Sequence, residues 1–288
     1  MGKRFQKLLE EKKKELRMKS PEGTIKRDTV NKQYQAKEAI KRLYRVILDN
    51  SNIPPKFREA TFSTFNLKAS TPKNINKVKS LINYADNILQ AIQIPQSVYM
   101  FSEYNGCGKT HLAVAILKKA AWEFARSIYD SDPLKYGRRG LNITSFLHNP
   151  VFFMSEKNYL YKKKLLFSTN DESIGEEVEL IEKMVIKADL LVIDDFFKER
   201  NTNFTFNEMT SWICLRYEQN KPVVFTSNMD FTDLATKNQK NPYYNTKNFN
   251  NATYLASRLS EMTKGYKFFF YSSPENDFRQ KEYTQGRR

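Results

Sequence analysis

The chain carries, at residues 102–111, the stretch Ser102-Glu103-Tyr104-Asn105-Gly106-Cys107-Gly108-Lys109-Thr110-His111. The phosphate-binding-loop pattern is G-x-x-x-x-G-K-[ST], and Gly108, Lys109 and Thr110 match its second half. Glu103 stands where the pattern has its first glycine. The stretch is therefore a candidate nucleotide site with one departure, and its surroundings decide what it means.

The stretch lies between a short apolar run, SVYMFSE at 97–103, and a helical pattern at 111–126. A strand that leads through a loop into a helix directs backbone N–H groups and the helix N-terminus at a phosphate. Lys109 would then bridge the β- and γ-phosphates of ATP, and Thr110 would ligate Mg²⁺. The candidate nucleotide-contacting residues are Asn105, Gly106, Cys107, Gly108, Lys109, Thr110 and His111.

Two further apolar runs end in polar side chains. DLLVIDD at 189–195 ends in Asp194, which would hold the Mg²⁺ shell, and Asp195, which would orient or deprotonate the attacking water. KPVVFTSN at 221–228 ends in Asn228, whose amide can hold the same water. Each ending taken singly is an ordinary strand-to-turn transition. In this order along one chain, together with the loop, they predict a P-loop ATPase.

Apolar runs and helical patterns alternate along the chain. Such alternation favours a three-layer α/β domain with a mainly parallel five-stranded sheet. The expected strands are 97–103, 151–156, 189–195, 221–228 and 266–273, with helical patterns such as 78–89 and 111–126 between them. Residues 127–150 and 236–251 are expected to be surface loops.

The first 50 residues are basic, with 15 Lys+Arg against 7 Asp+Glu. Apolar residues recur at helical spacing over 5–16 and again over 30–48, so we expect two amphipathic helices in a small N-terminal arm. This arm is either a solvated helical hairpin or a partner-docking element. Ile53-Pro54-Pro55 breaks the pattern, which predicts a division into residues 1–50 and an ATPase domain at 51–288.

The composition points to a polyanionic partner. The net charge is +16 from 48 Lys+Arg and 32 Asp+Glu, and such an excess attracts nucleic acid. No apolar run reaches the ~20 residues of a membrane span, and the two cysteines fit a reduced, cytoplasmic protein. Surface binding to a membrane through 5–19 is the remaining alternative.

Several motifs resemble the DnaC/DnaI/IstB group of AAA+ ATPases, most closely the DnaI-type helicase loaders, and the resemblance covers about 52–280. The motifs are the lead-in at 52–62, GCGKTHLA at 106–113, LLVIDD at 190–195 followed by Glu199, the TSW at Thr210–Trp212, FTSN at 225–228 and Ser257-Arg258-Leu259. Two features depart from this group. Glu103 replaces a glycine, and a zinc-binding N-terminal module is impossible because no Cys or His precedes residue 107.

The resemblance implies further site residues. Arg258 would be the arginine finger that reaches the γ-phosphate of a neighbouring subunit. Arg279 matches a C-terminal arginine of the group and would sense nucleotide within its own subunit. The segment Phe57–Phe65 would lie near the adenine, with Phe62 or Phe65 as stacking candidates, although buried packing explains those two rings equally well.

The resemblance also implies a function: ATP-dependent loading of a hexameric replicative helicase onto single-stranded DNA, in the replication of a phage or other mobile element. The subunits would self-associate through AAA+ interfaces, and the arm at 1–50 would grip the helicase. Lys162-Lys163-Lys164 and Arg138-Arg139 are candidate DNA contacts. Two alternatives stay open: an IstB-like helper ATPase for transposition, and a non-catalytic adaptor or inhibitor that occupies the helicase.

Overall fold

The computed structural model describes residues 21–67, 70–138, 149–169, 171–197, 203–237 and 249–272. Five strands form one sheet: β1 (Val98–Phe101), β2 (Val151–Ser155), β3 (Leu190–Phe196), β4 (Val223–Ser227) and β5 (Lys267–Phe269). Their order is β2-β3-β4-β1-β5, and every pairing is parallel. Each of the five predicted runs contains one strand, so the predicted parallel sheet is confirmed.

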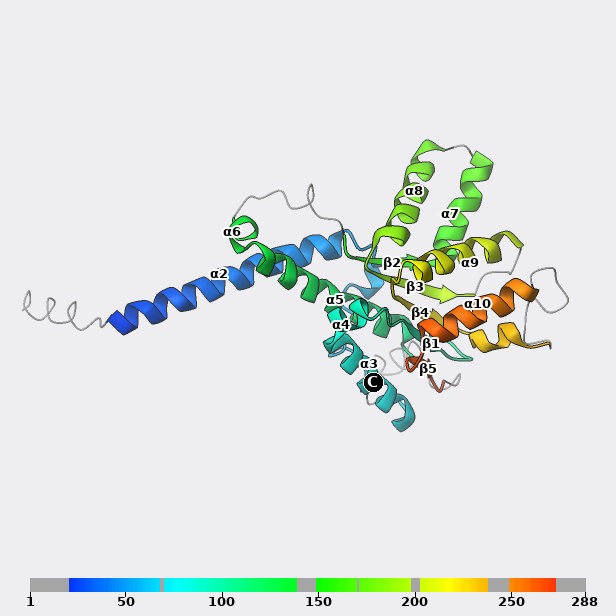
Figure 1. Ribbon diagram of the computed structural model, residues 1–288, viewed down its shortest axis with the longest axis horizontal. Coiled ribbons are helices and arrows are strands. Elements are labelled where there is room, and N and C mark those ends of the chain that lie inside the picture. The colour runs from blue at the N-terminus through cyan, green and yellow to red at the C-terminus, as the bar shows by residue number, and fades with distance from the viewer. Residues whose placement is uncertain are drawn as a thin grey trace, which may run out of the picture.

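Helices cover both faces of the sheet, as a parallel sheet requires. On one face lie α2 (Pro21–Asp49), α3 (Pro72–Asp86), α4 (Ile88–Gln93) and α5 (Lys109–Ser131). On the other lie α7 (Glu156–Thr169), α8 (Glu172–Lys187), α9 (Asn203–Glu218), α10 (Phe249–Met262) and the 3₁₀ turn η3 (Phe231–Ala235). Figure 1 shows these layers. The three-layer α/β fold is thereby confirmed.

Alternation along the strands divides the core in two. Val98 and Met100 of β1 pack toward α5, whereas Tyr99 packs with Phe225 and Phe231 on the opposite face. Successive strand side chains point to opposite faces, and both faces are apolar here. The strands therefore read as continuous apolar runs, which is why their positions could be predicted.

One predicted loop is wrong in its first part. Residues 127–150 were expected to form a surface loop, but α5 continues to Ser131 and a short helix, α6 (Pro133–Tyr136), follows. Ile128 and Tyr129 pack against the core, which extends the amphipathic face of α5 beyond the expected end. Residues 139–148 lie outside the described residues, as do residues 238–248 of the second predicted loop. That loop, expected over 236–251, is wrong at its end, because helix α10 begins at Phe249.

In the N-terminal region the described residues begin with α2. This long helix starts at Pro21 and extends away from the sheet (Figure 1). Proline is favoured in the first turn of a helix. Leu43 and Ile47 are buried in the same core as α5, and the Tyr44 ring meets Trp122 edge-on at 5.5 Å. The helix expected over 5–19 lies outside the described residues, and the boundary at residue 50 stays a prediction.

Candidate nucleotide-binding site

The sheet order places three strand ends side by side. Strand β4 lies between β3 and β1, so the carboxyl end of β4 separates the loop after β1 from the carboxylates after β3. Ligands of open parallel sheets bind at these carboxyl ends. The residues predicted from three distant parts of the chain therefore meet at one edge of the sheet.

The backbone of the loop depends on two glycines. Gly106 has φ 86° and Gly108 has φ 87°, a left-handed conformation in which a Cβ is strained. Helix α5 begins at Lys109, directly after Gly108. Its first N–H groups therefore face the loop. The Glu103 side chain is exposed to solvent, so its carboxylate does not fill the loop from inside.

Lys109 turns inward and is buried, with 6% of its surface exposed. Its Nζ donates to Ser102 Oγ at 2.5 Å and to Asn228 Oδ1 at 3.1 Å. The Asn228 amide nitrogen in turn donates to Asn105 Oδ1 at 3.0 Å. The two predicted site residues Lys109 and Asn228 are thus in direct contact, and Asn228 ties β4 to the loop.

Asp194 is the buried acidic group of the site. Its Oδ1 accepts hydrogen bonds from Thr110 Oγ1 at 2.7 Å and from Thr226 Oγ1 at 2.6 Å. Burial raises the pKa of the Asp194 carboxyl above its usual range, and the nearby charge of Asp195 adds to this rise. The two hydroxyl donors and the charge of Lys56 lower the same pKa and so oppose the rise. An ionised Asp194 is therefore poised to gain from a cation placed beside it.

Asp195 lies near the end of β3, where the register with β4 shifts. It has φ 58°, in the left-handed region that aspartate tolerates better than most residues. Its N–H donates to Thr226 Oγ1 at 3.0 Å, and its side chain is half-buried. Thr226 therefore fixes both acidic residues, through a hydroxyl that donates to one and accepts from the other.

The oxygens present fit a magnesium ion that arrives with a nucleotide. Mg²⁺ prefers oxygen ligands and usually takes one or two from the protein, with the rest from phosphates and water. The Thr110 hydroxyl and the Asp194 carboxylate are two such oxygens. Among the described residues no group of three His, Cys, Asp or Glu side chains could hold a metal alone. These oxygens therefore suit a nucleotide-bound ion.

The segment before the sheet crosses the start of α5. His111 Nε2 lies 2.8 Å from the carbonyl oxygen of Thr61, and its ring meets Phe65 edge-on at 5.5 Å. Phe65 is buried and Phe62 is half-buried against the same core. The segment is therefore next to the loop, as the resemblance implies, while the stacking role of either ring stays a prediction.

Arg258 lies on α10 and contacts its own subunit. Its guanidinium carbon is 4.5 Å from the ring centre of Tyr217 and 4.7 Å from that of Tyr254. Its Nη1 donates to the Tyr217 hydroxyl at 3.0 Å and lies 3.7 Å from the Glu261 carboxylate. These contacts join α9 and α10 instead of reaching the loop. Arg279 lies outside the described residues.

Sequence reasoning missed three residues of the site. Ser102 and Thr226 are fully buried hydroxyls that contact Lys109 and Asp194, and Lys56 acts on Asp194 through its charge. Ser102 and Thr226 lie near the ends of the apolar runs 97–103 and 221–228, which were correctly predicted as strands. A polar residue that closes a buried strand must find a partner, and that signal could have identified both.

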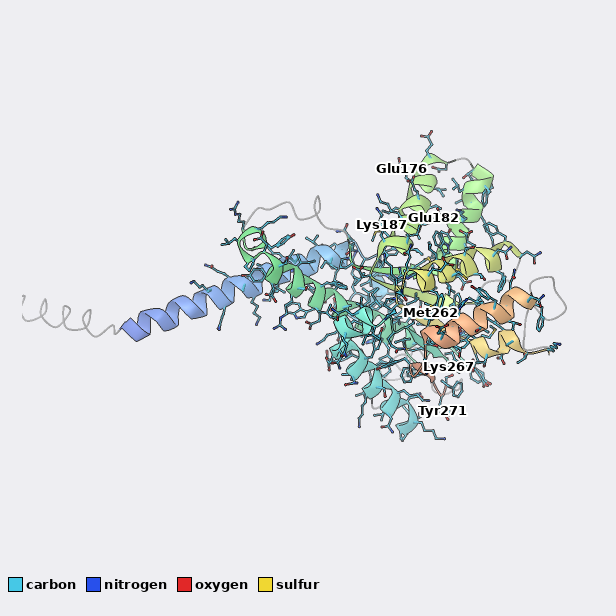
Figure 2. The ribbon with its side chains drawn as sticks, viewed as in Figure 1. Glu176, Glu182, Lys187, Met262, Lys267 and Tyr271 are labelled. Atoms are coloured by element: carbon cyan, nitrogen blue, oxygen red, sulfur yellow. The ribbon has the colours of Figure 1, made fainter. Side chains whose placement is uncertain are left out.

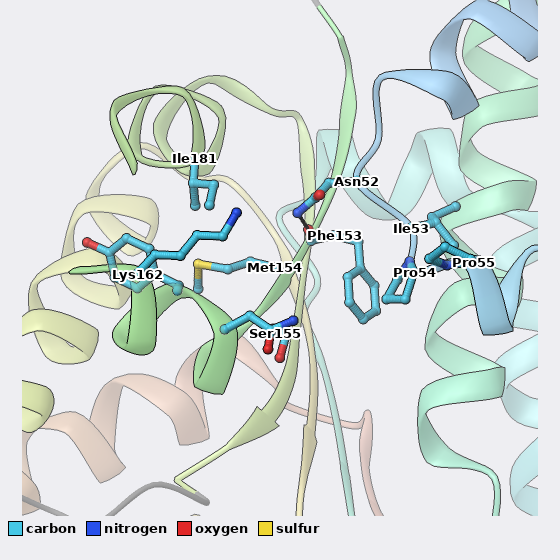
Figure 3. A pocket seen from close by; sticks show the side chains of 11 residues that line it. Asn52, Ile53, Pro54, Pro55, Phe153, Met154, Ser155, Lys162 and Ile181 are labelled. Atoms are coloured by element: carbon cyan, nitrogen blue, oxygen red, sulfur yellow. Dashed lines mark hydrogen bonds between the residues drawn. The ribbon is translucent and has the colours of Figure 1, made fainter. Parts of the chain in front are cut away.

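A hollow lies at the β2 edge of the sheet (Figure 3), where β3 and β4 separate β2 from β1 and the phosphate loop. It has a volume of about 240 Å³ and is lined by Asn52–Pro55, by Phe153–Ser155 at the end of β2, and by residues of α7 and α8. Ser155 is in register with Asp194. Neither Lys109 nor Thr110 lines this hollow, so it is a neighbour of the site and not the phosphate cradle.

The candidate DNA contacts differ in their surroundings. Lys162 is paired with Glu177, and Lys163 is paired with Glu182. Lys164 and Arg138 are exposed. Arg139 lies outside the described residues. The two paired lysines would have to leave a carboxylate before they could bind a phosphate.

No family model matches the chain, and no curated protein matches it. Among solved structures, the chain is similar to a DnaC helicase loader (19% identity, 76% of this chain and 100% of that one, TM-score 0.48) and to DnaI (16%, 76% and 94%, 0.47). A replication initiator DnaA bound to AMPPCP and single-stranded DNA is also similar (14%, 82% and 56%, 0.48).

In the described part of the chain, no helix combines the length and apolar character needed to cross a bilayer. The likenesses to solved structures are distant, so the fold assignment rests on the sheet order and the loop geometry given above. The first two structures bear the names of the group that the sequence motifs resemble. The chain has a parallel three-layer α/β fold with a phosphate loop between β1 and α5.

Proposed function

We propose that this protein binds and hydrolyses ATP and uses the cycle to load a hexameric replicative helicase onto single-stranded DNA. One observation carries the ATPase part. Lys109, Thr110, Asp194 and Asn228 come from three separate segments and form two hydrogen-bonded pairs, Lys109 with Asn228 and Thr110 with Asp194, beside a glycine-rich loop. A lysine, a hydroxyl, a buried carboxylate and an amide in this arrangement are the groups that phosphoryl transfer requires.

Each residue has a role in this proposal. Lys109, held in place by Ser102 and Asn228, would bind phosphate oxygens through a charge-assisted contact, which is stronger than a contact with a neutral oxygen. Thr110 and Asp194 would hold Mg²⁺, which neutralises charge that develops on the phosphates. Asn228 and Asp195 would orient the attacking water, and Asp195 would accept its proton.

Hydrolysis by this scheme needs a second subunit. Arg258 has its contacts on α9 and α10, so it would act on the site of a neighbouring copy and stabilise the transferring phosphoryl group there. The ATP-bound subunits would associate head to tail. Isolated subunits are then expected to bind ATP but to hydrolyse it slowly.

The loader role rests on the motif resemblance, and the N-terminal region supplies its partner contact. Residues 1–50 are basic and helical in pattern, and α2 extends from the ATPase fold (Figure 1). Light scattering after size exclusion would test this on the full chain mixed with a replicative helicase, with and without ATP·Mg²⁺. We expect a complex that is lost when residues 1–35 are removed, a deletion that ends before the buried core residues Ala39, Leu43 and Ile47 of α2. Separate peaks in every condition would contradict the proposal.

Asp195 favours one alternative, because its carboxylate is one methylene shorter than a glutamate that could activate water from the same position. A non-catalytic adaptor would bind the helicase and would not need hydrolysis. The substitution Lys109→Ala separates the two roles: it abolishes biological activity of a loader and leaves that of an adaptor intact. An IstB-like helper would instead form ATP-dependent filaments on duplex DNA and would not bind a helicase.

A further inference from the structure

The start of the loop, where Glu103 replaces the usual glycine, is held through the backbone of the next residue, Tyr104. The Tyr104 N–H donates to Ser272 Oγ at 3.1 Å, and the Tyr104 carbonyl accepts from Ser272 Oγ at 3.3 Å and from Ser102 Oγ at 2.6 Å. The Ser272 hydroxyl therefore contacts both the backbone N–H and the backbone carbonyl of Tyr104.

The segment that carries Ser272 is itself fixed. Beyond β5, the Phe270 N–H donates to the carbonyl of Phe101 at 2.7 Å, which extends the pairing with β1. The side chain of Asn74, a residue of α3 that is 4% exposed, makes two hydrogen bonds to the backbone of Tyr271. Its Nδ2 donates to the Tyr271 carbonyl at 2.8 Å, and its Oδ1 accepts from the Tyr271 N–H at 2.9 Å. Tyr271 lies beside α3 in Figure 2.

These contacts continue to the phosphate-binding lysine. A serine hydroxyl has one proton to donate and two lone pairs to accept with. Ser102 donates its proton to the Tyr104 carbonyl, so its lone pairs are left to face the Lys109 ammonium. Where Tyr104 lies therefore determines how Ser102 is turned, and Ser102 determines where Lys109 is held.

We propose that Asn74 and Ser272 are positioning residues of the phosphate loop, which act through Tyr104 and Ser102 on Lys109. This inference rests on the proposed nucleotide-binding function and adds residues to it. Neither side chain is placed to contact phosphate. Their combined effect is to hold from outside a loop start at which Glu103 replaces the usual glycine.

The proposal couples nucleotide binding to helix α3, because Asn74 of α3 holds Tyr271, the residue before Ser272. A partner that displaces α3 would release Tyr104, and with it the ordered position of Lys109. ATP affinity is then expected to respond to events at α3 without any change at the phosphate contacts.

The test uses the full chain with the substitution Ser272→Ala, its conservative partner Ser272→Thr, and Ser80→Ala as a matched control. Ser80 is an exposed serine of α3 whose hydroxyl bonds only within its helix. Two quantities are measured: the Kd for ATP·Mg²⁺ by titration with a fluorescent analogue, and amide hydrogen exchange of the peptide that contains Tyr104.

We expect Ser272→Ala to raise the Kd about five- to tenfold, the effect of one or two lost hydrogen bonds, and to speed exchange at Tyr104. Ser272→Thr restores both, and Ser80→Ala changes neither. Wild-type exchange at Tyr104, or faster exchange with an unchanged Kd, would overturn the proposal. Faster exchange throughout β3 and β4 would also overturn it, because the effect would then be global instability.

A second variant tests the contact on the other side. Asn74→Asp keeps the acceptor for the Tyr271 N–H and removes the donor to its carbonyl, so we expect a smaller rise in Kd in the same direction. If the wild-type protein does not bind ATP, the proposed function fails. Exchange at Tyr104 in the two variants still decides whether Asn74 and Ser272 hold the loop, and unchanged rates would refute that.

Discussion

Lys109 and Arg258 are two cations predicted for the same phosphate group, and their surroundings are opposite. Lys109 is buried at the centre of the site, where the neutral oxygens of Ser102 and Asn228 hold it. Arg258 is partly exposed on α10 between two tyrosine rings. The fold of one chain brings Lys109 to the loop and to Asn228, whereas it holds Arg258 on α10, away from the loop.

The difference follows from how each residue is attached to the sheet. Lys109 follows β1, and the parallel pairing of β1 with β4 sets its distance from Asn228 within one domain. Arg258 is held by α9 and α10 through Tyr217 and Glu261. In the proposed function, Lys109 serves its own site and is positioned by strand pairing, whereas Arg258 would serve another subunit's site and lies on an outer helix.

The largest expected effect comes from Lys109→Ala. Removing the buried cation should raise the Kd for ATP·Mg²⁺ about 10²- to 10³-fold, as expected for loss of a close charged contact, and should abolish hydrolysis. Nucleotide titration and phosphate release measure this. The control is Lys79→Ala, which removes an exposed lysine of α3. Near-wild-type affinity without Lys109 would show that the loop is not the phosphate site.

Arg258→Ala sharpens the contrast because it should separate binding from hydrolysis. We expect the ATP affinity to change less than about twofold and the hydrolysis rate to fall about 10²-fold, as when one transition-state donor is lost. Arg126→Ala, an exposed arginine of α5, serves as the control.

Mixing the Arg258→Ala and Lys109→Ala proteins should restore part of the hydrolysis. In the mixture, the Arg258→Ala protein supplies the intact loop and the Lys109→Ala protein supplies the intact arginine. No recovery in the mixture, with normal assembly, would argue against a role for Arg258 in a neighbouring subunit.

Asp194→Asn tests the buried carboxylate. Because burial raises the pKa of Asp194, its ionisation weakens the folded state. That loss develops as pH rises from the ordinary aspartate range through the raised pKa and is complete above the raised pKa. Asparagine can still accept from Thr110 and Thr226. Without nucleotide, we expect a melting temperature a few degrees higher at neutral pH, a gain that shrinks toward about pH 4.

The same variant should lose the stabilisation that ATP·Mg²⁺ gives to the wild-type protein, because the carboxylate oxygen for the ion is gone. Thermal melts at several pH values, with and without ATP·Mg²⁺, measure both effects. A lower melting temperature at neutral pH without nucleotide would mean that the ionised carboxylate is compensated within the protein itself.

The smallest expected effect is that of Tyr217→Phe. It removes the hydroxyl that accepts from Arg258 and donates to Glu261 and keeps the ring that covers the guanidinium. Since Tyr217 and Arg258 are partly exposed and Glu261 is exposed, we expect no measurable change in melting temperature or ATP affinity. Hydrolysis in the assembled state should stay within about twofold if Arg258 leaves this contact to act. A large loss would mean that the contact itself orients Arg258.

The sequence alone indicated most of what lies along the strands. Buried parallel strands are apolar on both faces, so β1 to β5 could be located from their runs, and the spacing Gly108-Lys109-Thr110 identified the loop. Asp194 and Asn228 were found because they end such runs. The continuation of α5 past residue 127 was missed, because its apolar face there is narrow and includes the aromatic Tyr129.

What only the tertiary structure decided is which of these residues meet. Periodicity carries no information on strand order, and it is the position of β4 between β3 and β1 that brings Asn228 to Lys109 and Thr226 to Asp194. The contacts of Asn74 with Tyr271 and of Ser272 with Tyr104 join residues 197 and 168 positions apart. Local patterns report local physics, whereas contacts over such separations exist only after the sheet and its helices have packed.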